Sequence, residues 1–282
     1  MYMKTLEDVV VIYHGYCYDG FGAAWAAWKK YGDSASYVSC TDRNTYPEGV
    51  IGKEVYVVDF CFDEKITKEL QENNKKLVVL DHHISVQYLV QSLKEYVFSE
   101  VDSGAKIAWK YFHPSIEVPV LIDYISDSDT WAHVLPFWKE IGAYIHAQEL
   151  EFYTFSSLNE ELAHAFENIV EKGAVLNKQF EKLVNEHIEK AVLVEYEEYK
   201  VYAVNASSFL RSELGHKLAL KKGPFSIVYR FEGDTLRVSL RGDGSVDCTK
   251  LVEKYGGGGH HDAAAFILKD RNPLPFSLCK SL

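Results

Sequence analysis

Short apolar runs that alternate with helix-type sequence constrain the fold of this chain more than any other feature. Three such runs, at 9–14 (VVVIYH), 54–60 (EVYVVDF) and 76–83 (KLVVLDHH), are rich in β-branched residues. Unbroken apolar strands that alternate with helices are typical of a parallel sheet covered on both faces. We therefore predict an α/β fold for the first half of the chain. The expected helices lie at residues 20–32, where Gly32 ends the first helix, 63–74 and 103–112.

The sequence changes character twice, which divides it into three parts. Residues 1–150 carry the alternating pattern, and residues 151–191 are polar, helical in pattern and poor in glycine and proline. In residues 192–282 strand-like runs dominate, and Gly233-Asp234 between two of them predicts a β-hairpin. We expect an N-terminal parallel-sheet domain, a helical linker and a smaller C-terminal domain of mixed α/β structure.

Composition and cysteine usage narrow the class of protein. With 282 residues, 47% of them hydrophobic, the chain can bury the cores of one large or two moderate domains. It holds no apolar run near the ~20 residues that cross a bilayer, and its first residues do not match a signal peptide. Its five cysteines are scattered without a CxxC pair, which favours reduced thiols in a cytoplasmic protein.

The charge is negative overall and unevenly distributed. The net charge of −11 argues against a broad grip on long duplex nucleic acid, which needs many cationic contacts to phosphates. Residues 192–282 hold 13 Lys+Arg against 11 Asp+Glu, whereas residues 1–191 hold 17 against 30. The acidic part suits divalent cations and the mildly basic part suits a small anionic substrate, although an acidic surface also confers solubility by itself.

Acids and histidines stand where the expected strands end. The carboxyl ends of parallel strands meet at one sheet edge, where open α/β sheets build their sites. A further apolar run at 120–129 is compatible with a strand or a helix and is counted here as the fourth strand. Carboxylates with imidazoles suit Mn²⁺, Zn²⁺, Fe²⁺ or Co²⁺, and several acids favour a pair of ions that clamps a phosphoryl group. Each residue alone would more often be a helix cap or an ordinary hydrogen-bonding side chain, so the prediction rests on their agreement. The residues are His14, Asp19, Asp59, Asp81, His82, His83, Asp127 and Asp129.

Five motifs follow one another in the order typical of a known family. They are HGYCYDGFGAA (14–24), VVDF (57–60), DHH (81–83), ISDSDTW (125–131) and GGGGHHDAAAF (256–266), and they span nearly the whole chain. The set resembles the DHH phosphoesterases, in particular the subgroup with a DHH-associated C-terminal domain that includes nano-RNases and cyclic-dinucleotide phosphodiesterases. The resemblance implies two domains with a cleft between them, a Mn²⁺ pair in the first domain and a substrate site in the second.

The resemblance also implies a role for each motif residue. Asp59 would bridge the two ions, and His83 would face the scissile phosphate. Asp129 matches the ligand of the fourth motif, with Asp127 as the competing candidate, and Asp81 would orient the histidines. The implied metal ligands are His14, Asp19, Asp59, His82 and Asp129, and the implied catalytic residues are His83, Asp59 and His82.

Two positions depart from the family pattern. Cys17 stands close to the position where many members carry an additional Asp. It acts either as a thiolate ligand, which favours a softer metal, or as a small residue packed beneath the site. Ala265 stands where the glycine motif usually ends in Gly, and alanine lacks ready access to positive φ.

The C-terminal part carries candidate contacts to a substrate. The glycines at 256–259 let backbone N–H groups approach a phosphate, and residues 261–268 have a helical pattern whose N-terminus would face the same anion. In the strand-like LRVSLRG, Arg237, Ser239 and Arg241 share one face, and the comparable segment of the family contacts substrate. The expected substrate-binding residues are Arg241, Gly258, Gly259, His260 and Ser239.

Together with the charge and the cysteine usage, the resemblance implies a cytoplasmic, metal-dependent phosphodiesterase, a nuclease of the oligoribonuclease kind. It would hydrolyse short oligonucleotides or linear or cyclic dinucleotides through a metal-bound hydroxide. A pair of Mn²⁺ ions is the expected cofactor, with Co²⁺ or Mg²⁺ as alternatives. The nearest alternative function is a polyphosphate or pyrophosphate hydrolase, because the same metal chemistry cleaves phosphoanhydrides; the other is a non-catalytic nucleotide-binding protein. The expected partner is a short nucleotide, without long duplex nucleic acid or a membrane, and a homodimer stays open.

Overall fold

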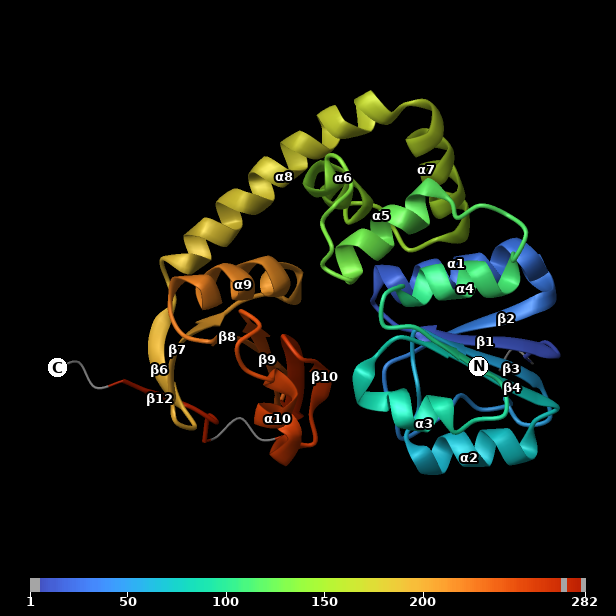
Figure 1. Cartoon of the computed structure of the whole chain (residues 1–282), viewed down its shortest axis with the longest axis horizontal. Coiled ribbons are helices and arrows are strands. Elements are labelled where there is room, and N and C mark those ends of the chain that lie inside the picture. Colours follow the sequence, from blue (N-terminus) through green and yellow to red (C-terminus); the bar gives the residue numbers. More distant parts are fainter. Residues whose placement is uncertain (1–5, 270–272, 280–282) are drawn as a thin grey trace. The chain divides into compact units, whose positions relative to one another are not determined.

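The computed structural model, which describes residues 6–269 and 273–279, separates the chain into two units (Figure 1). The units comprise residues 1–177 and 178–282, and the boundary falls inside the long helix α8 (Phe166–Ile188). Each unit has its own sheet and its own buried apolar side chains. Among the described residues, no helix combines the length and the apolar character needed to cross a membrane.

A parallel sheet with the strand order β2-β1-β3-β4-β5 forms the middle of the first unit. Helices α1 and α4 cover one face and α2 and α3 the other, so the central strands are buried on both faces, as their unbroken apolar sequence predicts (Figure 1). The strands are β1 (Val9–His14), β2 (Ala35–Cys40), β3 (Glu54–Val58), β4 (Lys76–Asp81) and β5 (Tyr96–Phe98). The helices are α1 (Tyr18–Tyr31), α2 (Glu64–Asn73), α3 (Gln87–Gln91), α4 (Gly104–Phe112), α5 (Val120–Asp129), α6 (Trp138–Ile145) and α7 (Phe152–His164).

The three predicted strands and the three predicted helices of this unit are confirmed as β1, β3 and β4 and as α1, α2 and α4. Local sequence explains their ends. Gly32 follows α1 with φ +54, Asp63 accepts a hydrogen bond from the Ile66 N–H at the start of α2, and Ser103 caps α4. The sequence pattern does not predict the edge strands β2 and β5, because they are short or partly polar and half-exposed.

The fourth strand expected at residues 120–129 is wrong, because this segment forms helix α5. Leu121, Ile122 and Ile125 are all buried, which matches the three-to-four-residue spacing of a helix face. Pro119 immediately before the helix lacks the N–H that the first turn would leave unpaired anyway. Asp127 and Asp129 therefore lie in the last turn of a helix rather than beyond a strand.

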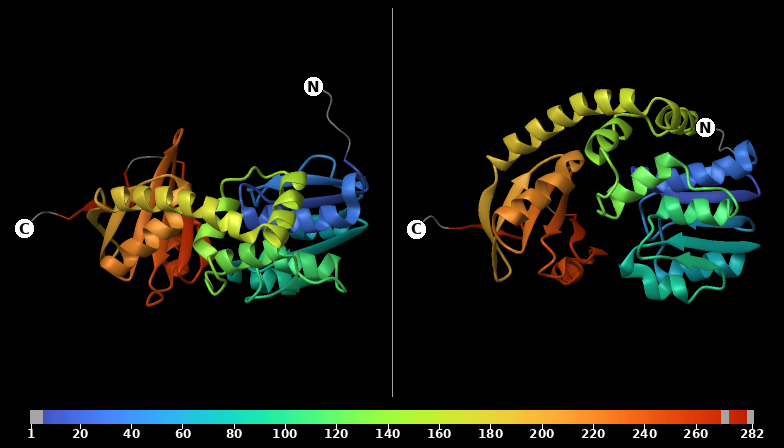
Figure 2. Two further views of the ribbon diagram at one scale, coloured as in Figure 1. Left: turned by 90° about the horizontal axis from the view of Figure 1, so that it is seen from above. Right: turned by 45° about the horizontal axis from the view of Figure 1, so that its top comes forward.

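A seven-stranded sheet with the order β10-β11-β9-β8-β7-β6-β12 forms the second unit. Strands β7 and β8 pair in parallel and the other neighbours pair antiparallel, including the predicted β8–β9 hairpin. Helix α9 packs on one face and α10 on the other (Figure 1 and Figure 2). The strands are β6 (Val192–Tyr196), β7 (Tyr199–Asn205), β8 (Phe225–Glu232), β9 (Thr235–Gly242), β10 (Gly258–His260), β11 (Ala263–Leu268) and β12 (Ser277–Leu278). The helices are α9 (Arg211–Lys221) and α10 (Cys248–Val252).

The helix expected at residues 261–268 is also wrong, because most of this segment forms strand β11. Ala264 and Phe266 are buried while Ala265 and Ile267 are exposed, so burial alternates with a period of two. Pairing with β9 on one side and β10 on the other outweighs the helix preference of the alanines. No helix N-terminus therefore faces the described glycines at 256–259 from this segment.

Candidate metal centre

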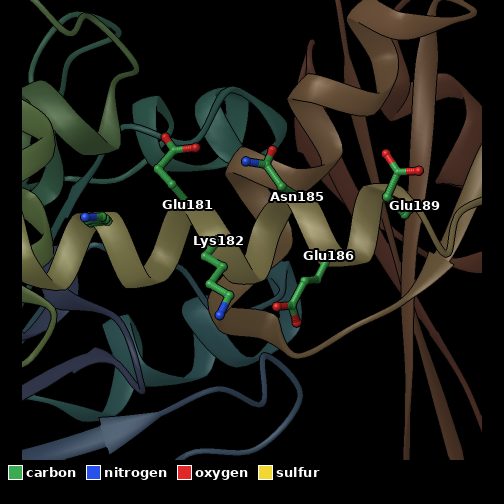
Figure 3. Close-up of a pocket in the computed structure, with 6 residues that line it drawn as sticks. Glu181, Lys182, Asn185, Glu186 and Glu189 are labelled. Carbon is green, nitrogen blue, oxygen red and sulfur yellow. The ribbon is translucent and has the colours of Figure 1, made fainter.

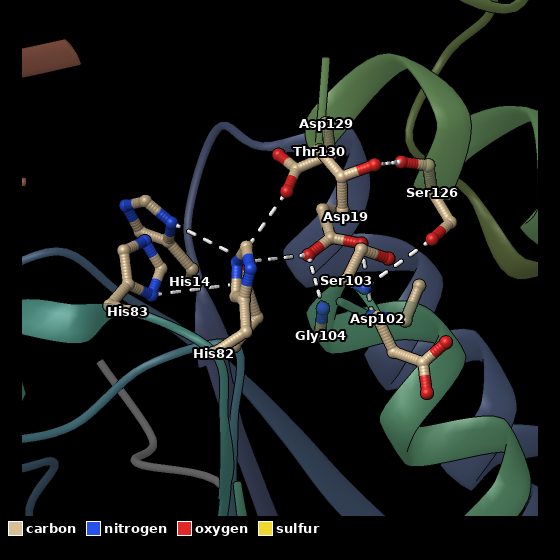
Figure 4. A network of polar contacts seen from close by, with 12 residues as sticks. His14, Asp19, His82, His83, Asp102, Ser103, Gly104, Ser126, Asp129 and Thr130 are labelled. Carbon is tan, nitrogen blue, oxygen red and sulfur yellow. Dashed lines mark hydrogen bonds and ion pairs between the residues drawn. The ribbon is translucent and has the colours of Figure 1, made fainter. Parts of the chain in front are cut away.

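The five implied metal ligands lie together at the carboxyl edge of the first sheet. Figure 4 shows His14, Asp19, His82 and Asp129 of this set. His82 is in contact with three acids: its Nε2 atom lies 3.1 Å from Oδ1 of Asp59, 3.5 Å from Oδ2 of Asp129 and 3.7 Å from Oδ2 of Asp19. On the other side of Asp59, Oδ2 lies 3.4 Å from Nδ1 of His14. Residues from β1, from α1, from the positions immediately after β3 and β4, and from α5 thus converge, although they are up to 115 positions apart in the sequence.

Asp59 is held in an unfavourable backbone conformation between two histidines. Its φ is +53, a region that residues with a Cβ rarely adopt, and its N–H donates to the Leu80 carbonyl at 2.8 Å. The Oδ2 atom is buried, and it finds no hydrogen-bond partner in the described part of the chain. A strained, buried acid with an unpartnered oxygen fits a metal ligand, because a cation would satisfy that oxygen.

Asp19 is fixed by the N-terminus of α4. Its Oδ2 accepts from the Gly104 N–H at 2.7 Å and its Oδ1 from the Ala105 N–H at 3.0 Å (Figure 4). These N–H groups belong to the first turn of the helix, where they lack helical partners and carry the positive end of the helix dipole. A Cβ at Gly104 would lie 2.4 Å from Cβ of Asp59, so glycine is required there. Sequence reasoning missed this glycine, and the Ser-Gly pair at the start of the helix was the available signal.

Asp81 organises the two histidines that follow it. Its Oδ1 accepts from the His82 N–H at 2.7 Å, from the His83 N–H at 3.1 Å and from Nδ1 of His83 at 2.7 Å. A carboxylate only accepts, so Nδ1 of His83 carries a proton and Nε2 is turned away from Asp81. Asp81 thus has the contacts expected of an orienting residue.

The two competing acids of α5 occupy different environments. Asp129 contacts His82, whereas Oδ1 of Asp127 accepts from the Val134 N–H at 2.8 Å and its carbonyl accepts from the Ala132 N–H at 3.1 Å. Asp127 therefore ties down the loop that follows α5, and the geometry places Asp129 with the candidate ligands.

The crowded acids shift one another's proton affinities. Burial, with the charges of the neighbouring acids, raises the pKa of Asp19 and Asp129. Burial alone would raise the pKa of Asp59 too, but the adjacent His14 and His82 outweigh it and lower that pKa well below its ordinary value.

In the two histidines, burial and the neighbouring acids shift the pKa in opposite directions, and the acids prevail. Burial opposes protonation of His82, but Asp59, Asp129 and Asp19 raise the pKa of its imidazole to about 10. In His83 the burial effect is outweighed by Asp81, which raises that pKa as well. Without a metal ion, the proton on His82 offsets part of the negative charge of the surrounding carboxylates. A divalent metal ion could take the place of this proton, and the donor set of carboxylates and imidazoles fits such an ion.

Cys17 lies among the same groups. Its thiol shares a cluster with His14 and Asp59, in which the possible ligand atoms lie within 4.8 Å of one another. Burial and the charges of Asp59, Asp129 and Asp19 raise the pKa of the thiol well above its ordinary value. The thiol is therefore protonated without a cation, and thiolate ligation would require a bound metal to displace the proton.

Arg241 and Ser239 lie on the face of β9 opposite its core residues, as the period of two predicts. The Arg241 guanidinium donates to the Leu240 carbonyl at 2.8 Å and to Oγ of Ser212 at 3.3 Å. Its stem packs on α9, where a Cβ at Gly215 would approach Cγ of Arg241 to 2.7 Å. Burial, with the nearby charge of Arg211, lowers the pKa of Arg241 to about 9, an environment that would favour an anion. Ser239 is buried.

The candidate glycines form the edge strand of the second sheet. Gly258, Gly259 and His260 make up β10, and a Cβ at Gly259, whose φ is +145, would lie 2.3 Å from the Ala263 carbonyl oxygen. Ala265 pairs with Gly258 and does not adopt positive φ, so the alanine at this position causes no strain.

A shallow depression along α8 of the second unit contains none of these residues. It is lined by Lys178, Glu181, Lys182, Asn185, Glu186 and Glu189 (Figure 3). Its mixture of acidic and basic side chains matches an ordinary solvated helix surface.

Comparisons with known proteins agree with this architecture. Residues 192–277 match the DHHA1 domain. The uncharacterized protein R106 of Acanthamoeba polyphaga mimivirus is 28% identical over 298 residues, which cover 95% of this chain and 69% of that protein.

Among solved structures, the DHH domain of a member of the s1p family of ribosomal proteins is 15% identical to this chain, with a TM-score of 0.57. The match covers 93% of this chain and 83% of the solved chain. The pGpG-specific phosphodiesterase PggH of Vibrio cholerae is 14% identical over 93% of both chains, with a TM-score of 0.50. RecJ of Thermus thermophilus, solved with Mn²⁺, is 13% identical over 92% of this chain and 49% of its own, also with a TM-score of 0.50. At these identities the likeness concerns the fold.

The first unit with its parallel sheet and the second unit with its DHHA1 match define a class of two-domain α/β proteins. Within that class, residues 192–277 form a DHHA1 domain, and the fold of the chain is similar to that of proteins with a DHH domain.

Proposed function

We propose that the protein is a metal-dependent phosphodiesterase that hydrolyses short oligonucleotides or linear or cyclic dinucleotides, with Mn²⁺ as its cofactor. The observation that carries the proposal is the cluster of carboxylates around His82, together with the buried Oδ2 atom of Asp59, which accepts no hydrogen bond within the described residues and lies 3.4 Å from Nδ1 of His14. The presence of a DHHA1 domain and the likeness in fold to a pGpG-specific phosphodiesterase and to Mn²⁺-bound RecJ support the same choice.

The donor set suits a pair of transition-metal ions. Mixed imidazole and carboxylate ligands favour Mn²⁺ over Mg²⁺, which prefers oxygen ligands and retains water. Bound ions would generate hydroxide from water near neutral pH and would neutralise charge on the phosphate. The residues that would hold them are His14, Asp19, Asp59, His82 and Asp129.

His83 would meet the phosphate. Its Nδ1–H donates to Asp81, which turns Nε2 away from that acid, and Asp81 raises the pKa of the imidazole and so favours its protonated form. An imidazolium can donate a hydrogen bond, and then a proton, to a phosphate oxygen on which negative charge develops. Asp59 stays ionised near neutral pH because its pKa is lowered.

The second unit would hold the part of the substrate that is not cleaved. Arg241 offers charge-assisted hydrogen bonds to a phosphate, and the glycines of β10 allow close approach of an anion to the backbone. The net charge of −11 disfavours long polyanions, which supports a substrate of a few nucleotides.

A panel of substrates tests the proposal. The protein is incubated with Mn²⁺ and pApA, cyclic di-AMP, RNA of two to ten nucleotides or polyphosphate. We expect cleavage of the short nucleotides, loss of activity in EDTA and better recovery with Mn²⁺ than with Mg²⁺. Full activity after exhaustive dialysis against EDTA would contradict the metal dependence, and a preference for polyphosphate would favour a phosphoanhydride hydrolase instead.

A further inference from the structure

Unfavourable backbone conformations gather beside the candidate metal centre. In the described part of the chain, six residues other than glycine adopt positive φ. One is Asp59 itself, Tyr16 lies two residues after His14, and Trp131 lies two residues after Asp129. A Cβ makes this conformation costly, and such strain is typical of functional sites, where the surrounding structure enforces it.

The turn that carries Tyr16 is fixed on both sides. The Gly15 N–H donates to the Cys40 carbonyl at 2.9 Å, and a Cβ at Gly15 would come within 2.6 Å of Oγ of Ser39. Cys17, on the other side, is the residue from which α1 begins. Tyr16 therefore adopts φ +56 because its neighbours are anchored to β2 and to α1.

The side chain of Tyr16 contributes nothing to the packing of its own unit. It is 93% exposed, and it makes no hydrogen bond, ion pair or ring contact with residues 6–269 or 273–279. The chain thus presents a bare aromatic ring, on a strained backbone, two residues from a candidate ligand. Consecutive Cα atoms are 3.8 Å apart, so the Cα of Tyr16 is at most roughly 7.6 Å from that of His14.

We propose that Tyr16 stacks on a nucleobase of the substrate and so determines that the substrate carries a base beside its scissile phosphate. This inference rests on the proposed function and deepens it. Every nucleobase offers a flat face to an aromatic ring, so stacking tolerates any sequence, which suits an enzyme for short nucleotides of varied composition. A polyphosphate chain offers no such face, so an aromatic ring beside the candidate metal centre would not contribute to its binding.

Substitutions at Tyr16 and a substrate without bases test this role. Tyr16→Ala removes the ring, and Tyr16→Phe keeps the stacking surface without the hydroxyl. Tyr153→Ala is the matched control: Tyr153 is also exposed, but it packs on Trp28, nine residues along α1 from Asp19. At a rise of 1.5 Å per residue, Trp28 lies about 13 Å along α1 from the candidate ligand Asp19, so Tyr153 is remote from the candidate metal centre.

The substrates are pApA and an abasic dinucleotide with the same phosphates. We expect Tyr16→Ala to lower kcat/KM for pApA roughly tenfold, in the range known for removal of one base–aromatic stack, and to change the abasic substrate less than twofold. Tyr16→Phe and Tyr153→Ala should both stay within twofold of the unaltered protein. An equal loss on both substrates, or no loss on either, would overturn the inference.

A binding measurement separates this inference from the proposed function. Calorimetric titration with an analogue of pApA in which a methylene group replaces the bridging oxygen of the scissile bond should show a roughly tenfold weaker Kd for Tyr16→Ala. Hydrolysis of pApA by the unaltered protein with an unchanged Kd in Tyr16→Ala would reject the role of Tyr16 alone. A protein that binds the analogue in a Tyr16-dependent way but cleaves no nucleotide would reject the catalytic proposal alone.

Discussion

Replacement of Gly104 by alanine should disable the candidate metal centre through one added methyl group. Gly104 begins α4, and its N–H donates to Asp19 at 2.7 Å. The new Cβ would lie 2.4 Å from Cβ and 2.7 Å from Oδ1 of Asp59, whereas ordinary contacts begin at 3.4 Å. Either Asp59 or the start of α4 must therefore move by about 1 Å, the difference between 3.4 and 2.4 Å.

Neither element yields easily. Asp59 is buried at positive φ with its N–H bonded to Leu80, and α4 packs closely against α1. A misplacement of ~1 Å in a catalytic site costs on the order of 10² in rate, and overpacking costs about 1–3 kcal/mol of stability. For a unit of this size, each kcal/mol lowers Tm by roughly 2–4 °C.

The assay combines kcat on pApA, metal content after gel filtration in Mn²⁺, and Tm. The matched control is Gly142→Ala in α6, where an added Cβ meets no described atom within 4 Å. That variant should keep its activity and metal, and it should gain up to about 0.5–1 kcal/mol because alanine favours a helix interior over glycine. If Gly104→Ala retains normal activity and metal content, Asp59 does not occupy the centre as described.

Three further predictions follow from the charges of the site. Asp59→Asn keeps a side chain that tolerates positive φ but removes the charge, so turnover should fall by roughly 10³ or more; near-normal turnover would place the chemistry elsewhere. Arg241→Ala should raise KM for dinucleotides about tenfold, since a charge-assisted hydrogen bond contributes ~1.5–3 kcal/mol, and loss of metal in this variant would contradict its assignment to substrate. In EDTA, stability should fall as pH rises from about 6.5 to about 10, because the folded chain retains the His82 proton that the unfolded chain releases. Urea titrations across this pH range should show a smaller loss of unfolding free energy for His82→Gln in EDTA and for the unaltered protein in saturating Mn²⁺ than for the unaltered protein in EDTA. An identical loss in all three samples would refute the assignment of this pKa to His82.

The sequence predicts secondary structure best where the local amino-acid pattern and the tertiary packing favour the same element. Strands β1, β3 and β4 are buried on both faces, so their apolar runs are continuous and their ends at His14, Val58 and Asp81 are sharp. The parallel arrangement then requires these ends to share an edge, which is why the amino-acid pattern alone suffices to group the candidate ligands.

The two wrong elements lie where the sequence alone is ambiguous. The run at 120–129 is apolar enough for a strand or a helix, and only its packing against α1, α4 and α7 decides for the helix. The alanines of β11 favour a helix locally, but β9 and β10 supply hydrogen-bonding partners on both sides that the local sequence does not reveal. In both cases the deciding contacts come from residues distant in the sequence.

In the candidate site, the sequence motifs predict the functional side chains but not the backbone groups that hold them in place. Motifs indicate the acids and histidines, yet the positions of those side chains depend on partners without a recognisable pattern. Asp19 is oriented by two N–H groups of α4, and Asp59 can lie beside them only because residue 104 has no side chain. Asp127, which competes with Asp129 on sequence alone, instead uses Oδ1 and its backbone carbonyl to fix the loop behind it. A set of acids in a sequence therefore indicates which groups a site contains, whereas contacts with residues distant in the sequence decide which of those acids come together.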